Sequence, residues 1–203
     1  MTCIAIIPAR SGSTRIPNKN IRDFHGKPII AYSIETAIET KLFDRIIVST
    51  DHPEIAKVVD NYDVEVHKRS AEMSKNEIGT QEVTASVLKG LHIDCCHVCC
   101  IYATAPLMSA CDLEYGYNVL SNEVEYAFAV GTNPLCDAGQ FYWGSAEAFR
   151  AGLPLIETYT AMIPIDDKRV CDINTEEDWL RAEKMYTDLH FVKERLAELP
   201  NNM

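Results

Sequence analysis

The chain opens with Met1-Thr2-Cys3-Ile4-Ala5-Ile6-Ile7 and continues with Pro8-Ala9-Arg10-Ser11-Gly12-Ser13-Thr14-Arg15-Ile16-Pro17-Asn18-Lys19-Asn20. The first part holds a short continuous apolar run, which predicts a buried strand over Thr2–Ile7. The second part is polar and carries one glycine and two prolines, so it predicts a loop. Ligands in parallel α/β sheets bind beside the carboxyl ends of the strands, and this first loop (residues 8–20) is therefore the first candidate site.

Apolar runs and helical patterns alternate along the rest of the chain. Further strands are predicted at Arg45–Ser49, Val64–His67, Val98–Tyr102, Tyr126–Val130 and Gly139–Trp143, and helices at Pro28–Thr40, Pro53–Asn61, Thr80–Leu91, Ser109–Leu120 and Thr175–Leu199, the last with Asn174 or Thr175 as its cap. This alternation predicts an α/β fold with a mostly parallel, doubly wound sheet. No linker, repeat or low-complexity stretch interrupts it, so residues 1–203 are expected to form a single domain.

Composition limits the classes of protein to which the chain can belong. Its 203 residues are 47% apolar and 24% charged, as in an ordinary globular protein long enough for one buried core. No apolar run reaches the length of a membrane span, and the N-terminus lacks the basic start of a signal peptide. We therefore expect a cytoplasmic protein with no membrane partner. The net charge of −11 argues against a nucleic-acid partner.

The charge is unevenly distributed along the chain. Residues 10–27 carry five basic side chains and one acidic side chain, which makes this segment +4 and leaves −15 for the remainder. The basic residues are Arg10, Arg15, Lys19, Arg22 and Lys27. A basic patch on an acidic protein predicts a small anionic ligand bound at one place.

Eight cysteines include the cluster Cys95-Cys96-His97-Val98-Cys99-Cys100, a composition that can bind metal or undergo redox chemistry. The same residues also fit a strand. There, residues four apart are separated by about 13 Å and residues three apart point to opposite faces, so the cluster cannot chelate one zinc ion. The cysteines are instead expected to be small, buried, reduced thiols.

The first loop matches neither of the two common phosphate loops. It lacks the three glycines of the Rossmann fingerprint and the glycine-lysine pair of the Walker pattern. Its small residues let backbone amides approach an anion, while Arg10, Arg15 and Lys19 supply three cations. These cations could hold a triphosphate and stabilise a departing pyrophosphate. The alternative is a solvated basic loop without a ligand.

Several blocks of the sequence resemble the acidic-sugar cytidylyltransferases, in the same order along the chain. They are the stretch from Ile6 to Asn20, Ser49-Thr50-Asp51, Cys99–Pro106, Asp137–Trp143 and Asp172–Trp179. Within them, Tyr102-Ala103-Thr104-Ala105-Pro106 and Asp137-Ala138-Gly139-Gln140-Phe141-Tyr142-Trp143 are similar to the pseudaminic acid branch. The resemblance covers most of the chain.

The resemblance implies a Rossmann-like nucleotidyltransferase fold and a reaction between CTP and a nine-carbon acidic sugar. The anomeric hydroxyl of the sugar attacks the α-phosphate, pyrophosphate leaves, and Mg²⁺ bridges phosphate oxygens. The matching positions assign catalysis to Arg10, Arg15 and Lys19, nucleotide binding to Arg10, Ser11, Gly12, Ser13, Arg69 and Thr80, sugar binding to Thr104, Asp137 and Gln140, and magnesium to Asp172 and Asn174.

The chain departs from the family pattern at three places. Thr14 stands where lysine is usual, although the ketodeoxyoctonate branch also has threonine there. Asn174 replaces the second of two metal-binding aspartates. Only five residues separate Gly131 from Asp137, where the family has a long arm that pairs two subunits and closes over the sugar. The arm is therefore expected to be missing, which leaves the oligomeric state open.

Two other interpretations remain open. A degenerate homologue that binds nucleotide or a partner without catalysis is favoured by Asn174 and by the short 131–137 segment, and disfavoured by the intact first loop. A cytidylyltransferase for sialic acid or ketodeoxyoctonate is disfavoured by the 137–143 block.

Overall fold

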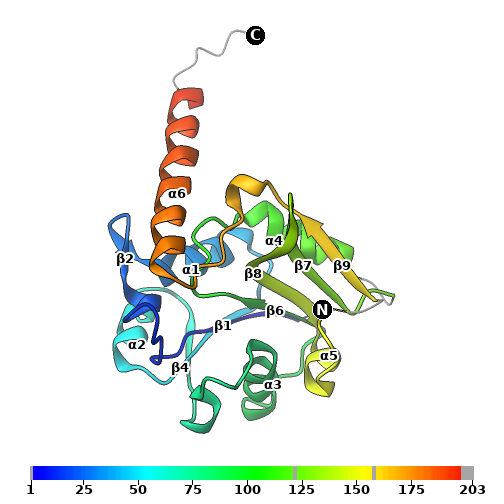
Figure 1. Cartoon of the computed structure of the whole chain (residues 1–203). Helices are drawn as coiled ribbons and strands as arrows, with labels where there is room; N and C mark the ends of the chain where they lie inside the picture. Colours follow the sequence, from blue (N-terminus) through cyan, green and yellow to red (C-terminus); the bar gives the residue numbers. More distant parts are fainter. Residues whose placement is uncertain (1, 121–122, 157–158, 198–203) are drawn as a thin grey trace.

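A seven-stranded sheet forms the centre of the molecule (Figure 1). The computed structural model describes residues 2–120, 123–156 and 159–197. From one edge to the other the strands are β5 (Glu65–Lys68), β4 (Arg45–Thr50), β1 (Cys3–Pro8), β6 (His97–Ile101), β8 (Leu135–Ser145), β7 (Tyr126–Thr132) and β9 (Thr160–Pro164). Every neighbouring pair is parallel except the two pairs that contain β8. The mostly parallel sheet predicted from the sequence is thereby confirmed.

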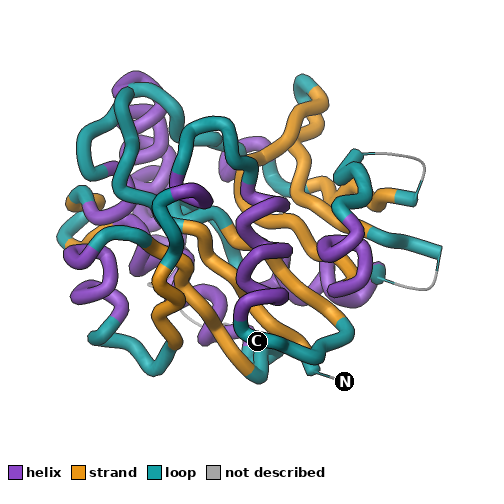
Figure 2. The backbone as a smooth tube through the Cα atoms, turned by 90° about the horizontal axis from the view of Figure 1, so that it is seen from below, coloured by secondary structure: helices purple, strands orange, loops and turns teal. Residues whose placement is uncertain are grey.

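Helices cover both faces of the sheet, as predicted for a doubly wound fold (Figures 1 and 2). One face packs against α1 (Ile29–Thr40), α2 (Pro53–Val59) and α4 (Ala110–Val119), and the other against α3 (Thr80–Gly90) and α5 (Ala146–Ala151). In β1, Ala5 and Ile7 belong to the first core, and Ile4 and Ile6 belong to the second. Alternate side chains of a strand point to opposite faces, so a strand covered on both sides needs the continuous apolar run seen here.

A third, smaller core lies beneath the start of α6 (Glu176–Ala197). There Trp179 packs on Phe24, and the centroids of the two rings are 5.5 Å apart. Phe24 belongs to a small hairpin formed by β2 (Asp23–Phe24) and β3 (Lys27–Pro28). Thr175 caps α6, because its hydroxyl accepts the Asp178 N–H at 3.2 Å while Asp178 Oδ2 accepts the Thr175 N–H at 2.9 Å. The last two residues of the predicted helix, 198–199, lie outside the described residues.

The sequence patterns did not predict β9, α5, the β2–β3 hairpin or the direction of β8. Only Asn133 and Pro134 separate the last paired residues of β7 and β8, so β8 must turn back antiparallel. Among the described residues, three short 3₁₀ turns, at Lys19–Ile21, Glu72–Ser74 and Asp167–Arg169, complete the fold. No helix among the described residues is both long enough and apolar enough to cross a membrane.

Three cysteines of the 95–100 cluster, Cys95, Cys99 and Cys100, are buried in the two cores, whereas Cys96 is exposed, so the prediction of buried thiols is wrong for Cys96. Cys99 packs on the α1 side of β6 and Cys100 on the α3 side, and both are buried. All eight cysteines of the chain are free thiols. Burial raises the pKa of the Cys100 thiol to about 11, so this thiol stays protonated at neutral pH.

Candidate functional site

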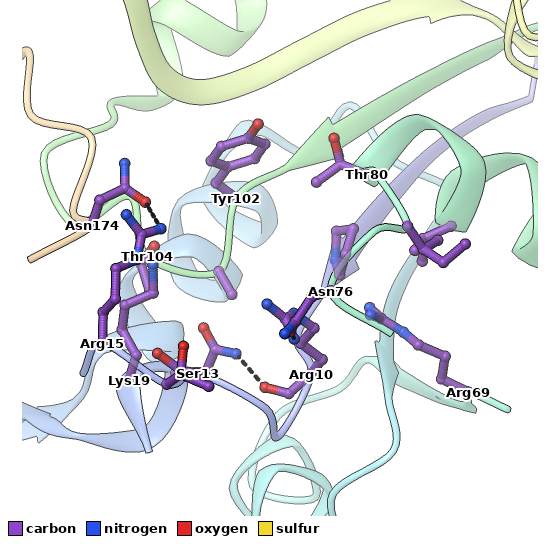
Figure 3. A pocket seen from close by; sticks show the side chains of 16 residues that line it. Arg10, Ser13, Arg15, Lys19, Arg69, Asn76, Thr80, Tyr102, Thr104 and Asn174 are labelled. Atoms are coloured by element: carbon purple, nitrogen blue, oxygen red, sulfur yellow. Dashed lines mark hydrogen bonds between the residues drawn. The ribbon is translucent and has the colours of Figure 1, made fainter. Parts of the chain in front are cut away.

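A cavity of about 410 Å³ opens at the carboxyl ends of β1 and β6 (Figure 3). From these two neighbouring strands the chain continues toward opposite edges of the sheet, to β4 and to β7. Such switch points are where ligands bind in open α/β sheets. The cavity is lined by residues of the first loop, by Arg69 and the 76–83 segment, by the loop after β6 (residues 102–104) and by Asn174. Segments far apart in the sequence therefore converge on one site, as the resemblance implies.

Three cations of the first loop reach the cavity and are held by neutral oxygens. Arg10 Nη1 donates to the Gly12 carbonyl at 3.1 Å and to Asn76 Oδ1. Arg15 Nη2 donates to Asn174 Oδ1 at 3.0 Å, and Lys19 Nζ donates to the Ile173 carbonyl at 2.6 Å. None of these three cations forms a salt bridge within the described part of the chain. Their positive charge is therefore available to an anionic ligand.

Electrostatics around Lys19 favour an anion in the cavity. Burial lowers the pKa of Lys19. The neighbouring Arg15 and Arg10 guanidinium groups lower this pKa further, and only the carboxylates of Asp172 and Asp178 act in the opposite direction. A bound phosphate would relieve this repulsion among cations, because it supplies the missing negative charge close to all three.

Arg69 reaches the cavity from the end of β5 and is only 6% exposed. Its Nη2 donates to the Ser49 carbonyl at 2.8 Å and its Nε to Ser49 Oγ at 3.3 Å. Burial lowers the pKa of Arg69, an effect opposed by the Asp51 carboxylate. Arg69 is thus fixed against the end of β4, beside Thr80 and Asn76 on the same side of the cavity (Figure 3).

The predicted phosphate-binding residues divide into two groups. Ser13 lines the cavity, whereas Ser11 and Gly12 do not. Ser11 is bound to Asp51 at the end of β4, with its N–H donating to Oδ1 at 2.9 Å and its hydroxyl donating to Oδ2 at 2.8 Å. Burial alone would raise the pKa of Asp51, but these hydrogen bonds from Ser11 hold it below its ordinary value. In this structure the Ser11 amide is therefore engaged by a carboxylate.

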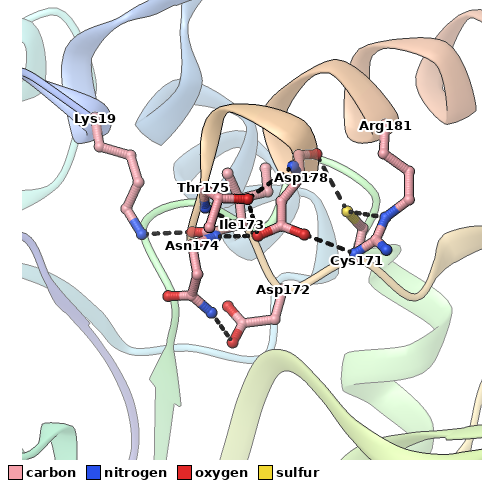
Figure 4. Close-up of polar contacts among 8 residues, drawn as sticks. All are labelled: Lys19, Cys171, Asp172, Ile173, Asn174, Thr175, Asp178 and Arg181. Atoms are coloured by element: carbon pink, nitrogen blue, oxygen red, sulfur yellow. Dashed lines mark hydrogen bonds and ion pairs between the residues drawn. The ribbon is translucent and has the colours of Figure 1, made fainter. Parts of the chain in front are cut away.

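The two residues assigned to magnesium lie in an extended loop before α6 rather than in a strand (Figure 4). Asn174 Nδ2 donates to Asp172 Oδ2 at 2.5 Å, while its Oδ1 accepts from Arg15. Removal from water raises the pKa of Asp172, and the nearby Asp137 carboxylate raises this pKa further. The Asn174 hydrogen bond and the Lys19 charge lower the same pKa. No group of three metal-ligating side chains occurs within the described ranges. Asp172 offers one carboxylate, a donor that suits a divalent cation when ligand phosphates and water complete the coordination shell.

Of the residues assigned to the sugar, only Thr104 lines the cavity. Asp137 is exposed. Its Oδ1 accepts a hydrogen bond of 2.8 Å from the Gly139 N–H, and its Oδ2 accepts one from the Tyr142 hydroxyl. Gln140 is 2% exposed; its Nε2 donates to the Arg169 carbonyl at 2.7 Å, and its Oε1 lacks a partner among the described residues. The structure does not bring Asp137 or Gln140 to the cavity wall.

Three polar residues that line the cavity were not singled out from the sequence, namely Asn20, Asn76 and Tyr102. Asn20 Nδ2 donates to the Arg10 carbonyl at 2.9 Å and so holds the first loop closed. Asn20 and Tyr102 lie inside blocks that carry the resemblance, whereas Asn76 lies between Arg69 and Thr80, two residues assigned to nucleotide binding; these positions were the only available signal. Their side-chain directions depend on contacts between segments, which local sequence patterns do not determine.

A cation-lined cavity at the switch point of a mostly parallel sheet is typical of α/β proteins that bind a phosphate-bearing ligand. The sequence profile of the family "Cytidylyltransferase" matches residues 4–176, and the chain belongs to this family. It is 30% identical to pseudaminic acid cytidylyltransferase of Campylobacter jejuni, over 94% of this chain and 98% of that protein. It is 32% identical to N-acylneuraminate cytidylyltransferase A of Danio rerio, over 89% of this chain and 50% of that protein.

Solved structures agree on the fold. CMP:2-keto-3-deoxy-manno-octonic acid synthetase complexed with CTP superposes with a TM-score of 0.74 at 14% identity, over 93% of this chain and 99% of that one. A manganese complex of Rv0371C from Mycobacterium tuberculosis superposes with a TM-score of 0.66 at 12% identity, over 91% of this chain and 99% of that one. The Rossmann-like nucleotidyltransferase fold implied by the sequence is therefore confirmed.

Proposed function

We propose that this cytidylyltransferase transfers CMP from CTP to the anomeric hydroxyl of a nine-carbon acidic sugar, with pseudaminic acid as the acceptor, and releases pyrophosphate. The observation that carries the proposal is the set of three cations, Arg10, Arg15 and Lys19, that face one cavity without a salt bridge to any described residue. A triphosphate is the ligand whose charge matches them.

The chemistry required of these residues is mainly electrostatic. The sugar oxygen forms a bond to the α-phosphorus, and its proton passes to water. The bond from that phosphorus to the bridging oxygen breaks, and the departing pyrophosphate keeps the electron pair. Arg10, Arg15 and Lys19 would stabilise the charge that develops on the phosphate oxygens. Ser13 would orient the phosphates from the same loop, with Ser11 and Gly12 becoming available once the loop adjusts around them.

We propose magnesium as the metal, held by Asp172 with Asn174 beside it. A bound Mg²⁺ would supply a Lewis acid for the phosphate oxygens. The Asn174 oxygen is engaged by Arg15, so Asp172 is the principal protein ligand in this proposal. One or two carboxylates commonly suffice for Mg²⁺ because nucleotide phosphates and water complete its coordination.

The base would be recognised by Arg69 and Thr80, which line the same side of the cavity. The acceptor would meet Thr104, which lines the cavity. Asp137 is kept in this proposal only because the resemblance assigns it to the sugar, and it does not line the cavity. Gln140 is enclosed and would support this side of the site from within. Pseudaminic acid is favoured among acidic sugars by the 137–143 block and by the relatives of that specificity.

We also propose a cytoplasmic location, because eight free thiols suit a reducing compartment. The two-residue connection between β7 and β8 supports the absence of the family's arm, and dimerisation by that route is not proposed. A second candidate function, nucleotide binding without catalysis, is favoured by one observation: the residue that contacts Asp172 from two positions further along the chain is the amide Asn174 and not an aspartate.

The decisive experiment is turnover by the purified chain with CTP, Mg²⁺ and a panel of nonulosonic acids, followed as pyrophosphate release. We expect more pyrophosphate release with pseudaminic acid than with sialic acid or ketodeoxyoctonate. Calorimetry should show tighter binding of CTP than of ATP or GTP. CTP binding without release on any acceptor would favour the non-catalytic candidate, and equal affinity for the three nucleotides would overturn the assignment to CTP.

A further inference from the structure

The guanidinium group of Arg69 is held along one side by a single residue, Ser49. Its Nε donates to Ser49 Oγ at 3.3 Å and its Nη2 to the Ser49 carbonyl at 2.8 Å. Because the group is planar, two contacts along one side fix both its position and its plane. Its Nη1 has no hydrogen-bond partner in the part of the chain that the structure describes. Since Arg69 lines the cavity, Nη1 is a donor available to a ligand (Figure 3).

The hydroxyl of Ser49 is fully buried, so its one proton needs an acceptor inside the protein. Arginine only donates, and Arg69 therefore cannot take this proton. Among the described residues, the other side-chain group within hydrogen-bond distance of Ser49 Oγ is Nδ1 of His67, at 3.1 Å. The hydroxyl thus donates to His67 while it accepts from Arg69.

The sheet places these three side chains together. His67 of β5 and Ser49 of β4 are directly paired residues of two parallel strands. The Arg69 N–H donates to the Thr50 carbonyl at 2.8 Å, which continues the same pairing past the end of β5. Residues two apart in a strand share a face, so Arg69 follows His67 on the face that holds Ser49. Burial and the Arg69 charge lower the pKa of His67, and its neutral ring can therefore accept at Nδ1.

We propose that His67 and Ser49 are positioning residues for Arg69: the imidazole fixes the Ser49 hydroxyl, and the hydroxyl fixes the guanidinium plane so that Nη1 meets an acceptor on the nucleotide base. The inference rests on the proposed function, because it takes the side of the cavity that contains Arg69 to be the base side. Neither His67 nor Ser49 lines the cavity, so both act on the ligand only through Arg69.

The test measures by calorimetry the affinities of CTP and of inorganic tripolyphosphate, which carries the phosphates without a base. Ser49→Ala removes the hydroxyl, and His67→Leu removes the acceptor of its proton. The Ser49 carbonyl still holds Arg69 in both variants, so the cation stays near the cavity but loses its fixed plane. We expect CTP affinity to fall about tenfold in each variant, in keeping with the loss of one hydrogen bond, while tripolyphosphate affinity keeps its wild-type value.

Two further variants sharpen the test. His67→Asn is the rescue variant, because its amide oxygen can accept from Ser49 in place of Nδ1, and it should restore the CTP affinity that His67→Leu loses. Thr40→Val is the matched control. The Thr40 hydroxyl is also buried, donates to the Ala37 carbonyl at 2.8 Å and accepts from the Leu42 N–H at 3.2 Å, and Thr40 does not line the cavity. This control should keep both affinities.

The outcomes separate this inference from the proposed function. If wild type binds CTP no more tightly than tripolyphosphate, the base side fails, and the proposed function and the inference fail together. If wild type prefers CTP and both Ser49→Ala and His67→Leu keep its affinity, the proposed function stands and the positioning role is overturned. Equal losses for both probes would likewise overturn it, since they would mean general damage to the site. Should Ser49→Ala fail to fold, the comparison of His67→Leu with His67→Asn decides.

Discussion

The side-chain oxygen of Asn174 accepts a hydrogen bond from Nη2 of Arg15 at 3.0 Å (Figure 3). The amide nitrogen of the same residue donates to Asp172 (Figure 4), so Asn174 bridges a cation of the first loop and the carboxylate next to it. Asn174 does not cap α6 with its side chain, since Thr175 does so. Of the two roles that the sequence left open for Asn174, its side chain is thus committed to the site.

Replacing Asn174 with aspartate should lower the Mg²⁺ concentration needed for half-maximal turnover, or create turnover if the natural protein has none. The change adds one negative charge next to Asp172, and Coulomb attraction to a divalent cation fixes the direction of the effect. A magnesium titration of both proteins, with CTP and acceptor saturating, provides the measurement. Superimposable curves would mean that the metal has been placed wrongly.

Alanine at Arg10 or Lys19 should weaken CTP binding roughly ten- to a hundredfold, because a charge-assisted contact contributes about 1.5–3 kcal/mol. Neither change should unfold the protein, since neither residue belongs to the hydrophobic cores. Calorimetry gives the affinity and thermal denaturation gives the stability. Lys57→Ala, which removes an exposed lysine paired with Glu54 on α2, is the control and should bind CTP normally. Unchanged affinity in either test variant would remove that residue from the site.

Asn76→Asp should reduce CTP affinity by about two- to fivefold, the size of an exposed ion pair. Asn76 accepts from Arg10 as a neutral amide, which leaves the guanidinium charge free for phosphate. An aspartate there would neutralise Arg10 and repel the triphosphate. Asn76→Ala removes the same contact without adding charge, so it should have the smaller effect. Equal effects of the two substitutions would show that charge at this position is irrelevant.

Gly139→Ala should destabilise the protein and raise its magnesium requirement. Gly139 has φ +63°, and a Cβ built there would lie 2.7 Å from the Cβ and 2.8 Å from the Cγ of Asp172. The left-handed backbone alone costs roughly 1–2 kcal/mol for alanine. The clash adds to this cost and displaces the Asp172 carboxylate.

Gly152→Ala separates these two effects. Gly152 has φ +64°, and a Cβ there would meet nothing within 4 Å. This control should lose comparable backbone stability while keeping its magnesium dependence. Thermal unfolding and a magnesium titration of both variants make the comparison, and an unchanged titration for Gly139→Ala would show that Asp172 does not serve the metal.

Local sequence patterns predicted those elements whose apolar residues are spaced according to the faces that the fold buries. The apolar run of β1 is required by cores on both of its faces, and the periodic helices α1, α3 and α4 appear close to their predicted ranges. β9 escaped prediction because it has only five residues, ends in proline and lies at a sheet edge with one inward side chain, Ile163, buried. Such a strand is defined by its partner β7 rather than by its own sequence.

The sequence by itself determined the strand β1, the cations of the first loop and the alternation that yields a mostly parallel sheet, because these depend on residue type and short-range periodicity. Only the tertiary structure decided which side chains of the site contact one another. It engages Asn174 with Arg15, encloses Gln140 and turns Asp137 toward Tyr142. Arg15 and Asn174 are 159 positions apart in sequence, and the direction of an amide between a cation and a carboxylate is set only when folding brings all three together.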